Sequence, residues 1–165
     1  MFGKEVVTPK GSFYDLEATL MDGSTKSMKD FKFSVLVVTN EPKSHEEILQ
    51  FVSKYKGEDG KGADEKFHFM AKSSVNGRST NEVFSFLKSK LPWTDGTKDV
   101  RWNFGKFLVS AEGLPYKRFG SKQAPDEMED DIVELLTRLE TGRGSSVGEA
   151  SAAASNIAKD GEPKE

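Results

Sequence analysis

Two short apolar stretches stand out from an otherwise polar chain. Residues 34–40 read Ser-Val-Leu-Val-Val-Thr-Asn, and residues 100–109 read Val-Arg-Trp-Asn-Phe-Gly-Lys-Phe-Leu-Val. Both are rich in β-branched or aromatic residues and too short for a buried helix, so each predicts a buried strand. The turn residues Ser-Ala-Glu-Gly follow at 110–113, and residues 114–119 then predict the second strand of a hairpin that lies in the core.

Shorter segments predict further strands and turns. Asp22-Gly23 separates the segments 12–18 and 24–28, which is a hairpin signal. Residues 67–71, Phe-His-Phe-Met-Ala, predict a short strand, and Val-Asn-Gly at 75–77 predicts a turn.

Apolar residues at helical spacing predict three helices. Each starts at a capping signal and ends at Gly or Pro: Ser44 with Glu47 to Gly57, Ser79 with Glu82 to Pro92, and Asp126 to Gly142. The faces expected to pack inward are Ile48, Phe51, Val52 and Tyr55; Val83, Phe84, Leu87 and Leu91; and Met128, Ile132, Leu135, Leu136 and Leu139.

The composition fits one globular domain with loose ends. The chain has 165 residues, of which 35% are hydrophobic. We expect a flexible arm at 1–11, a folded domain at 12–141 and a disordered tail at 142–165, where almost nothing apolar remains to be buried. The net charge of −3 gives no reason to expect a nucleic acid or an anionic membrane as partner. No long apolar run or signal-like start is present, so we expect a soluble cytoplasmic protein.

The cysteine count limits the chemistry of the chain. It contains no cysteine, which excludes disulfides, thiolate zinc sites and thiol catalysis. His45 and His68 are the two histidines, and without a clustered carboxylate motif they are weak evidence for a metal. We expect both to be hydrogen-bonded or solvated, and we expect no metal and no cofactor.

The stretch from 100 to 119 resembles a known family. It contains Trp-Asn-Phe-x-Lys-Phe-Leu-Val from Trp102 to Val109, a Glu-Gly turn, and a strand that ends in Lys-Arg-Phe. This motif closely resembles the signature of the glutathione peroxidase family, a branch of the thioredoxin-like fold. Ser-Phe-Tyr-Asp-Leu at 12–16 matches the family's opening. The resemblance covers residues 12–140 apart from one gap, and it implies an α/β fold with a central mixed β-sheet flanked by helices and an N-terminal hairpin.

The gap falls after Asn40. In the family, the strand that resembles 34–40 leads to a helix bearing the selenocysteine or cysteine nucleophile, then to another central strand and a loop with a glutamine. Here the chain continues directly into Glu41-Pro42-Lys43-Ser44, which resembles the segment after those pieces. The resemblance therefore implies that one family helix and one family strand are missing. We expect the sheet to close, with 67–70 beside 35–38 in a four-stranded mixed sheet. The alternative is a chain that does not fold stably.

Trp102 and Asn103 are the candidate site residues. In the family, as the resemblance implies, a Trp, a Gln and an Asn donate hydrogen bonds to a reacting selenolate or thiolate. Trp102 and Asn103 match two of these four positions, and the nucleophile and the Gln are absent. Donors without a nucleophile offer no two-electron route for peroxide reduction. Trp102 is also consistent with an ordinary core residue, whereas a buried Asn103 would need a partner.

Two functions follow for comparison. The first is an inactive remnant of a thiol-dependent hydroperoxide reductase of oxidative-stress defence, for which the family reductant would be glutathione or thioredoxin. The second is a non-catalytic interaction module that uses the open sheet edge or the tail. Three basic residues have two interpretations: they attract an anionic peptide such as glutathione, or they form a solvated face. These residues are Lys117, Arg118 and Lys122.

Overall fold

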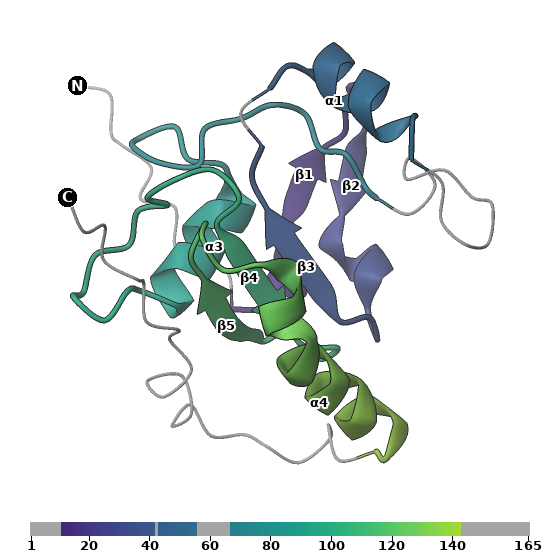
Figure 1. The fold of residues 1–165 in the computed structure, drawn as a ribbon, viewed down its shortest axis with the longest axis vertical. Helices are drawn as coiled ribbons and strands as arrows, with labels where there is room; N and C mark the ends of the chain where they lie inside the picture. The colour runs from purple at the N-terminus through teal and green to yellow at the C-terminus, as the bar shows by residue number, and fades with distance from the viewer. Residues whose placement is uncertain (1–10, 42, 56–66, 143–165) are drawn as a thin grey trace.

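The computed structural model describes residues 11–41, 43–55 and 67–142. Most of the arm and tail expected at the two ends, and the helix stop expected at Gly57, lie outside these residues. The elements in chain order are η1 (Phe13–Asp15), β1 (Glu17–Thr19), β2 (Thr25–Ser27), η2 (Met28–Phe31), β3 (Leu36–Thr39), α1 (His45–Val52), α3 (Glu82–Lys90), β4 (Lys106–Val109), β5 (Pro115–Phe119), η3 (Pro125–Met128) and α4 (Glu129–Glu140) (Figure 1).

The centre of the fold is a three-stranded antiparallel sheet in the order β3-β4-β5. Val38 faces Phe107 in the first ladder, and Phe107 faces Arg118 in the second. All four residues of β4 are buried, as a strand with a neighbour on each side should be. The predicted hairpin is thus confirmed, but β4 starts at Lys106 rather than at residue 100. The chain turns before it, and Phe104 has a positive φ of 59°.

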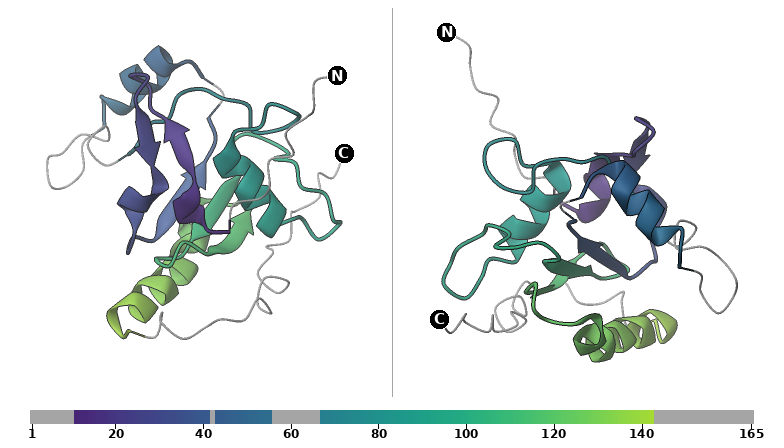
Figure 2. Two further views of the ribbon diagram at one scale, coloured as in Figure 1. Left: turned by 180° about the vertical axis from the view of Figure 1, so that it is seen from behind. Right: turned by 45° about the horizontal axis from the view of Figure 1, so that its top comes forward.

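The side chains of the sheet alternate between two apolar clusters. Phe107 and Val109 point into the larger cluster, which η1, η2 and α3 complete. Leu108 points the opposite way and packs with Phe119 and two α4-side residues, Met128 and Leu135. Figure 2 shows the same arrangement, with α3 and the β1-β2 hairpin on one side of the sheet and α4 on the other.

The N-terminal hairpin is confirmed. β1 and β2 pair antiparallel, with Ala18 opposite Lys26. Gly23 has a φ of 85°, a left-handed conformation that glycine adopts at little cost, and the Asp22 carboxylate accepts the Ser24 N–H at 2.8 Å. The Asp-Gly signal therefore marked the turn correctly.

The expected closure of the sheet is wrong. Residues 67–70 form no strand beside β3; instead Met70 makes a single antiparallel bridge to Leu20, and the Ala71 N–H donates to Thr19 O at 2.6 Å. The segment therefore pairs with the edge of the N-terminal hairpin, at Thr19 and Leu20, and not with β3. Among the described residues, β3 pairs only with β4.

The first helix has the expected cap but not the expected burial. In α1, Ser44 and Glu47 form the capping box, with the Glu47 N–H donating to Ser44 Oγ at 3.2 Å. No residue of this helix is buried, and Phe51 is 52% exposed. The prediction that this face packs inward is therefore wrong. Periodicity reports an apolar face, but burial also requires a surface to receive it.

The second and third helices match the sequence more closely. All four expected α3 residues are buried, although the N-cap is Asn81, not Ser79, and its Oδ1 accepts the Phe84 N–H at 2.9 Å. Of the residues expected on the inward face of the last helix, Met128 in η3 and Leu135 in α4 are buried, but Leu136 is exposed. The short helix η3 precedes α4, and the Glu127 carboxylate closes its first turn by accepting the N–H of residue 124 at 2.7 Å. The expected cap, Asp126, instead lies inside η3.

Candidate functional site

Trp102 and Asn103 lie in the turn that enters β4. The next residue, Phe104, donates its N–H to Asn40 O at 3.0 Å, which ties the turn to the first residue after β3. Trp102 is 72% exposed and Asn103 is partly buried. The interpretation of Trp102 as a core residue is therefore wrong. The pair lies beside the end of β3, where the chain passes directly into the α1 segment.

An unpaired acceptor lies against this turn. Asn40 Oδ1 is buried and has no hydrogen-bond partner among the described residues. It lies close to Gly105, since a Cβ built there would be 3.7 Å from Oδ1 and 3.2 Å from a Val100 methyl group. An indole N–H and a side-chain amide are donors that can stabilise an anion. The turn thus combines two candidate donors with one unsatisfied acceptor.

The main chain leading into the turn is held by a partly buried amide, that of Asn76, and by a buried lysine, Lys88. Asn76 Nδ2 donates to Val100 O at 2.8 Å, and Asn76 Oδ1 accepts the Val100 N–H at 2.9 Å. Lys88 Nζ, from α3, donates to Val75 O at 2.6 Å and to Asn76 Oδ1 at 3.0 Å. The Val-Asn-Gly turn is therefore a support of the site, a role that local sequence did not reveal.

Arg118 holds the loop between α3 and the turn. Its side chain is 1% exposed, and its guanidinium donates to Lys98 O at 3.0 Å and to Asp99 O at 2.7 Å. It also stacks over the Trp93 ring at 3.9 Å, and the Trp93 indole N–H donates to Asp99 O at 2.9 Å. A planar fork with several donors suits this role better than a lysine would.

The other two basic residues near Arg118 behave differently from each other. Lys117 pairs with Asp131 of α4 at 2.8 Å, while Lys122 is exposed. The three residues therefore form neither a basic patch nor a uniform solvated face, and both interpretations fail for Arg118, which is buried.

Lys106, the lysine of the motif, is a buried cation at the start of β4. Its ammonium group donates to Gln123 O at 2.7 Å. Burial lowers the pKa of Lys106, and the carboxylate of Glu127 opposes this shift. Lys106 thus anchors the loop after β5, which gives this lysine of the motif a structural role.

The histidines are used in separate contacts. His45 Nε2 accepts the Lys72 N–H at 2.7 Å, and the His68 ring packs edge-on against Phe31 with centroids 4.8 Å apart. Within residues 11–41, 43–55 and 67–142, no group of three or more His, Asp or Glu side chains lies close enough together to hold a metal ion.

No helix in the described ranges is long and apolar enough to cross a bilayer.

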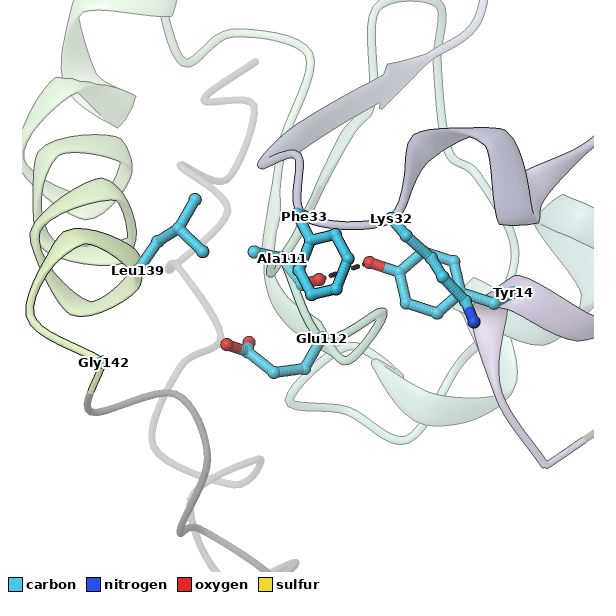
Figure 3. A pocket seen from close by; sticks show the side chains of 7 residues that line it. All are labelled: Tyr14, Lys32, Phe33, Ala111, Glu112, Leu139 and Gly142. Carbon is cyan, nitrogen blue, oxygen red and sulfur yellow. Dashed lines mark hydrogen bonds between the residues drawn. The ribbon is translucent and has the colours of Figure 1, made fainter.

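A hollow of about 340 Å³ lies at the opposite end of β4 from Trp102. Tyr14, Phe33, Ala111, Glu112 and Leu139 contribute to its wall, and the Tyr14 hydroxyl donates to Ala111 O (Figure 3). Gly113 borders the Tyr14 ring so closely that a Cβ there would lie 2.7 Å from it. Lys32 and Gly142 complete the lining, and no residue of the Trp102 turn contributes to it, so the hollow is separate from the candidate site.

Comparisons with known proteins agree with the motif. No family model matches the chain. A glutathione peroxidase of Lactococcus lactis is 32% identical over 158 residues, an alignment that takes in 76% of this chain and 99% of the relative. Since 76% of 165 residues is fewer than 158, the relative carries residues that have no counterpart here.

Other relatives match over part of their length. A glutathione peroxidase of Schistosoma mansoni is 38% identical over 98 residues, which are 59% of this chain and 53% of the relative. The glutathione peroxidase-like peroxiredoxin HYR1 of Saccharomyces cerevisiae is 38% identical over 100 residues, which are 61% of this chain and 57% of the relative. In these two cases the matched stretch spans about half of the relative's length.

The fold is shared with solved structures. The crystal structure of T. cruzi GPX1 superimposes with a TM-score of 0.60 at 25% identity, covering 76% of this chain and 97% of that one. These matches confirm the thioredoxin-like α/β fold class, and the cysteine-free chain fits the expected loss of the family nucleophile. The protein belongs to the glutathione peroxidase family.

Proposed function

We propose that this chain is a catalytically silent member of its family, whose inherited role is the thiol-dependent reduction of hydroperoxides in oxidative-stress defence. One observation carries the proposal: the Trp102–Asn103 turn is present and exposed in a chain that contains no cysteine. In this proposal, Trp102 and Asn103 are remnants of the family's donor set. The names of the relatives support the inherited role.

The chemistry explains why the donors alone are insufficient. Two-electron cleavage of a peroxide O–O bond needs a nucleophile that attacks one oxygen and releases the other as water or alcohol. Indole and amide N–H groups lower the energy of an anion but supply no electron pair for attack. Methionine can be oxidised to its sulfoxide by peroxide, but this reaction consumes the protein and is not turnover without a separate reductase.

In this proposal, the chain has no oxidised group for a reductant to regenerate. Glutathione or a thioredoxin-like protein would have to reduce an oxidised nucleophile, which is absent. Of the three basic residues considered for an anionic peptide, Arg118 is buried and Lys117 is paired with Asp131. We therefore propose that neither reductant is consumed.

A cytoplasmic location is part of the same proposal and is tested by imaging the tagged chain in cells.

Peroxide consumption tests this proposal. The purified chain is mixed with hydrogen peroxide or an organic hydroperoxide, and NADPH loss is followed through glutathione reductase or through thioredoxin reductase with thioredoxin. An active family member serves as the positive control. We expect the same background rate for the protein and for Trp102→Phe. Turnover that falls in Trp102→Phe would overturn the proposal, because it would require a working site at this turn.

A second candidate function is a non-catalytic interaction module. It is favoured by one specific observation: β3 has a neighbour on only one side among the described residues. An open strand edge can accept an added strand from another chain through main-chain hydrogen bonds. This candidate is compatible with catalytic silence, since it does not use the Trp102 turn.

A further inference from the structure

The open edge of β3 lacks the features that normally protect such an edge. Residues 35–39 read Val-Leu-Val-Val-Thr, without charge, proline or glycine. Natural edge strands are usually interrupted by a lysine, a proline or a bulge, because unpaired N–H and C=O groups otherwise recruit another strand. The one bulge of this sheet lies between β4 and β5, away from the open edge. Within the described part of the chain, nothing pairs with this edge of β3, and its sequence offers no obstacle to an added strand.

One apolar side chain of β3, that of Val37, is about half exposed. Leu36 and Val38 pack against the larger apolar cluster, so Val37 points to the opposite face of the sheet. On that face, Val37 is 47% exposed. A strand added at the open edge would place a side chain beside Val37 and cover part of this surface.

The charges on either side of β3 are of opposite sign. Lys29 and Lys32 precede the strand, while the intervening Asp30 is already paired with Lys26 at 2.9 Å. Three carboxylates follow it, accompanied by one lysine: Glu41, Glu46 and Glu47, with Lys43. An antiparallel copy of the same strand would bring the positive flank of each chain beside the negative flank of the other, twice over. A parallel copy would bring like charges together.

We propose that two copies of this chain associate through β3, antiparallel and related by a two-fold axis at Val37. This deepens the interaction-module candidate and rests on it. In this register Val37 faces Val37 of the second copy, and Leu36 faces Val38 of that copy. Each pair shares one face of the joined sheet, because the two-fold axis perpendicular to the sheet preserves its faces. The result is a continuous six-stranded sheet in the order β5-β4-β3-β3-β4-β5.

The absence of cysteine allows a direct test of the register. In Val37→Cys, the only thiols of the dimer would face each other across antiparallel strands, where Cα atoms are about 4.5–5.5 Å apart. This separation lies within the range of about 4.4–6.8 Å that disulfides accept. The matched control is Val133→Cys on α4, because Val133 is also about half exposed, at 53%. We expect fast disulfide dimer formation under mild oxidation for Val37→Cys alone. Equal rates for the two variants would overturn the proposed register.

Sedimentation equilibrium tests the association itself. The wild-type mass should rise from 18.3 kDa towards twice that value with concentration. Val37→Lys, which places a charge on a half-exposed position, should remain monomeric, whereas Val133→Lys should associate like the wild type. Circular dichroism verifies that both variants fold. A wild-type chain that stays monomeric up to about 1 mM, the weak end of measurable association, would overturn self-pairing. So would a dimer that survives Val37→Lys. Neither result bears on catalytic silence, which peroxide consumption measures independently.

Discussion

The side chain of Asn76 grips the main chain of Val100 with both of its amide atoms. Nδ2 donates to Val100 O at 2.8 Å, and Oδ1 accepts the Val100 N–H at 2.9 Å. A neighbouring strand would pair with Val100 in the same way, and Val100 lies two residues before Trp102. The approach to the candidate site is thus fixed by a residue far away in sequence.

Replacing Asn76 should therefore loosen the turn and the fold together. In Asn76→Ala, two backbone groups of Val100 lose their partner, which should lower the free energy of unfolding by about 1–3 kcal/mol. Urea denaturation measures the change. Asn103→Ala is the control: no hydrogen bond of the Asn103 side chain occurs within the described part of the chain, so its effect should stay within about 0.5 kcal/mol. Equal effects of the two variants would contradict this assignment.

The two tryptophans should report opposite environments. Trp93 is 4% exposed and hydrogen-bonded, while Trp102 is 72% exposed. In Trp93→Phe, the remaining fluorescence should be red-shifted and readily quenched by acrylamide. In Trp102→Phe, it should be blue-shifted and protected. Efficient protection of Trp102 would show that the turn is covered, contrary to the exposed site described here.

Arg118→Lys should be destabilising although the charge is kept. A lysine cannot reach three carbonyl groups and stack on Trp93 at once, so buried acceptors lose their donors. We expect a loss of about 2–3 kcal/mol in the free energy of unfolding. Arg138→Lys, on the exposed side of α4, should change stability by less than about 0.5 kcal/mol. A similar, small effect at both positions would refute the structural role of Arg118.

The buried hydroxyl of Tyr14 should make the free energy of unfolding fall at alkaline pH. Burial raises the pKa of Tyr14, and the Glu112 carboxylate raises it further, while a backbone hydrogen bond from Phe33 opposes the shift. The unfolded chain therefore loses this proton first, near a pKa of about 10. Stability from this group is fully present below that pH and falls as pH rises towards the folded-state pKa. The absorbance at 295 nm of the wild type minus Tyr14→Phe should show a transition above the ordinary value. A transition at or below it would contradict the burial.

Local signals predicted the elements whose partners are close in sequence. The Asp22-Gly23 hairpin, the Ser44 capping box and the buried face of α3 all follow from patterns within a few residues. The hairpin of β4 and β5 was also found, because its turn and its apolar strands are adjacent.

Long-range contacts account for what the sequence did not predict. The motif around Trp102 looks like one strand, but the Phe104–Asn40 hydrogen bond bends its first half into a turn. α1 has an apolar face with no described surface to cover. Arg118 and Asn76 form hydrogen bonds with backbone groups that are about 20 positions or more away. No local sequence pattern indicates which distant groups a side chain will bind. The resemblance to the family located the candidate pair, but not its exposure.

The central claim is that the shortened chain still folds around the β3-β4-β5 sheet and carries the Trp102 turn on it. Hydrogen exchange measured by mass spectrometry or NMR tests this claim directly. In a solution dilute enough to keep the chain monomeric, we expect the slowest exchange in β4, which has a partner on both sides, and faster exchange in β3, which has one among the described residues. The fastest exchange should occur in α1, which buries no side chain. Rapid exchange throughout residues 36–39 and 106–109 would contradict the account.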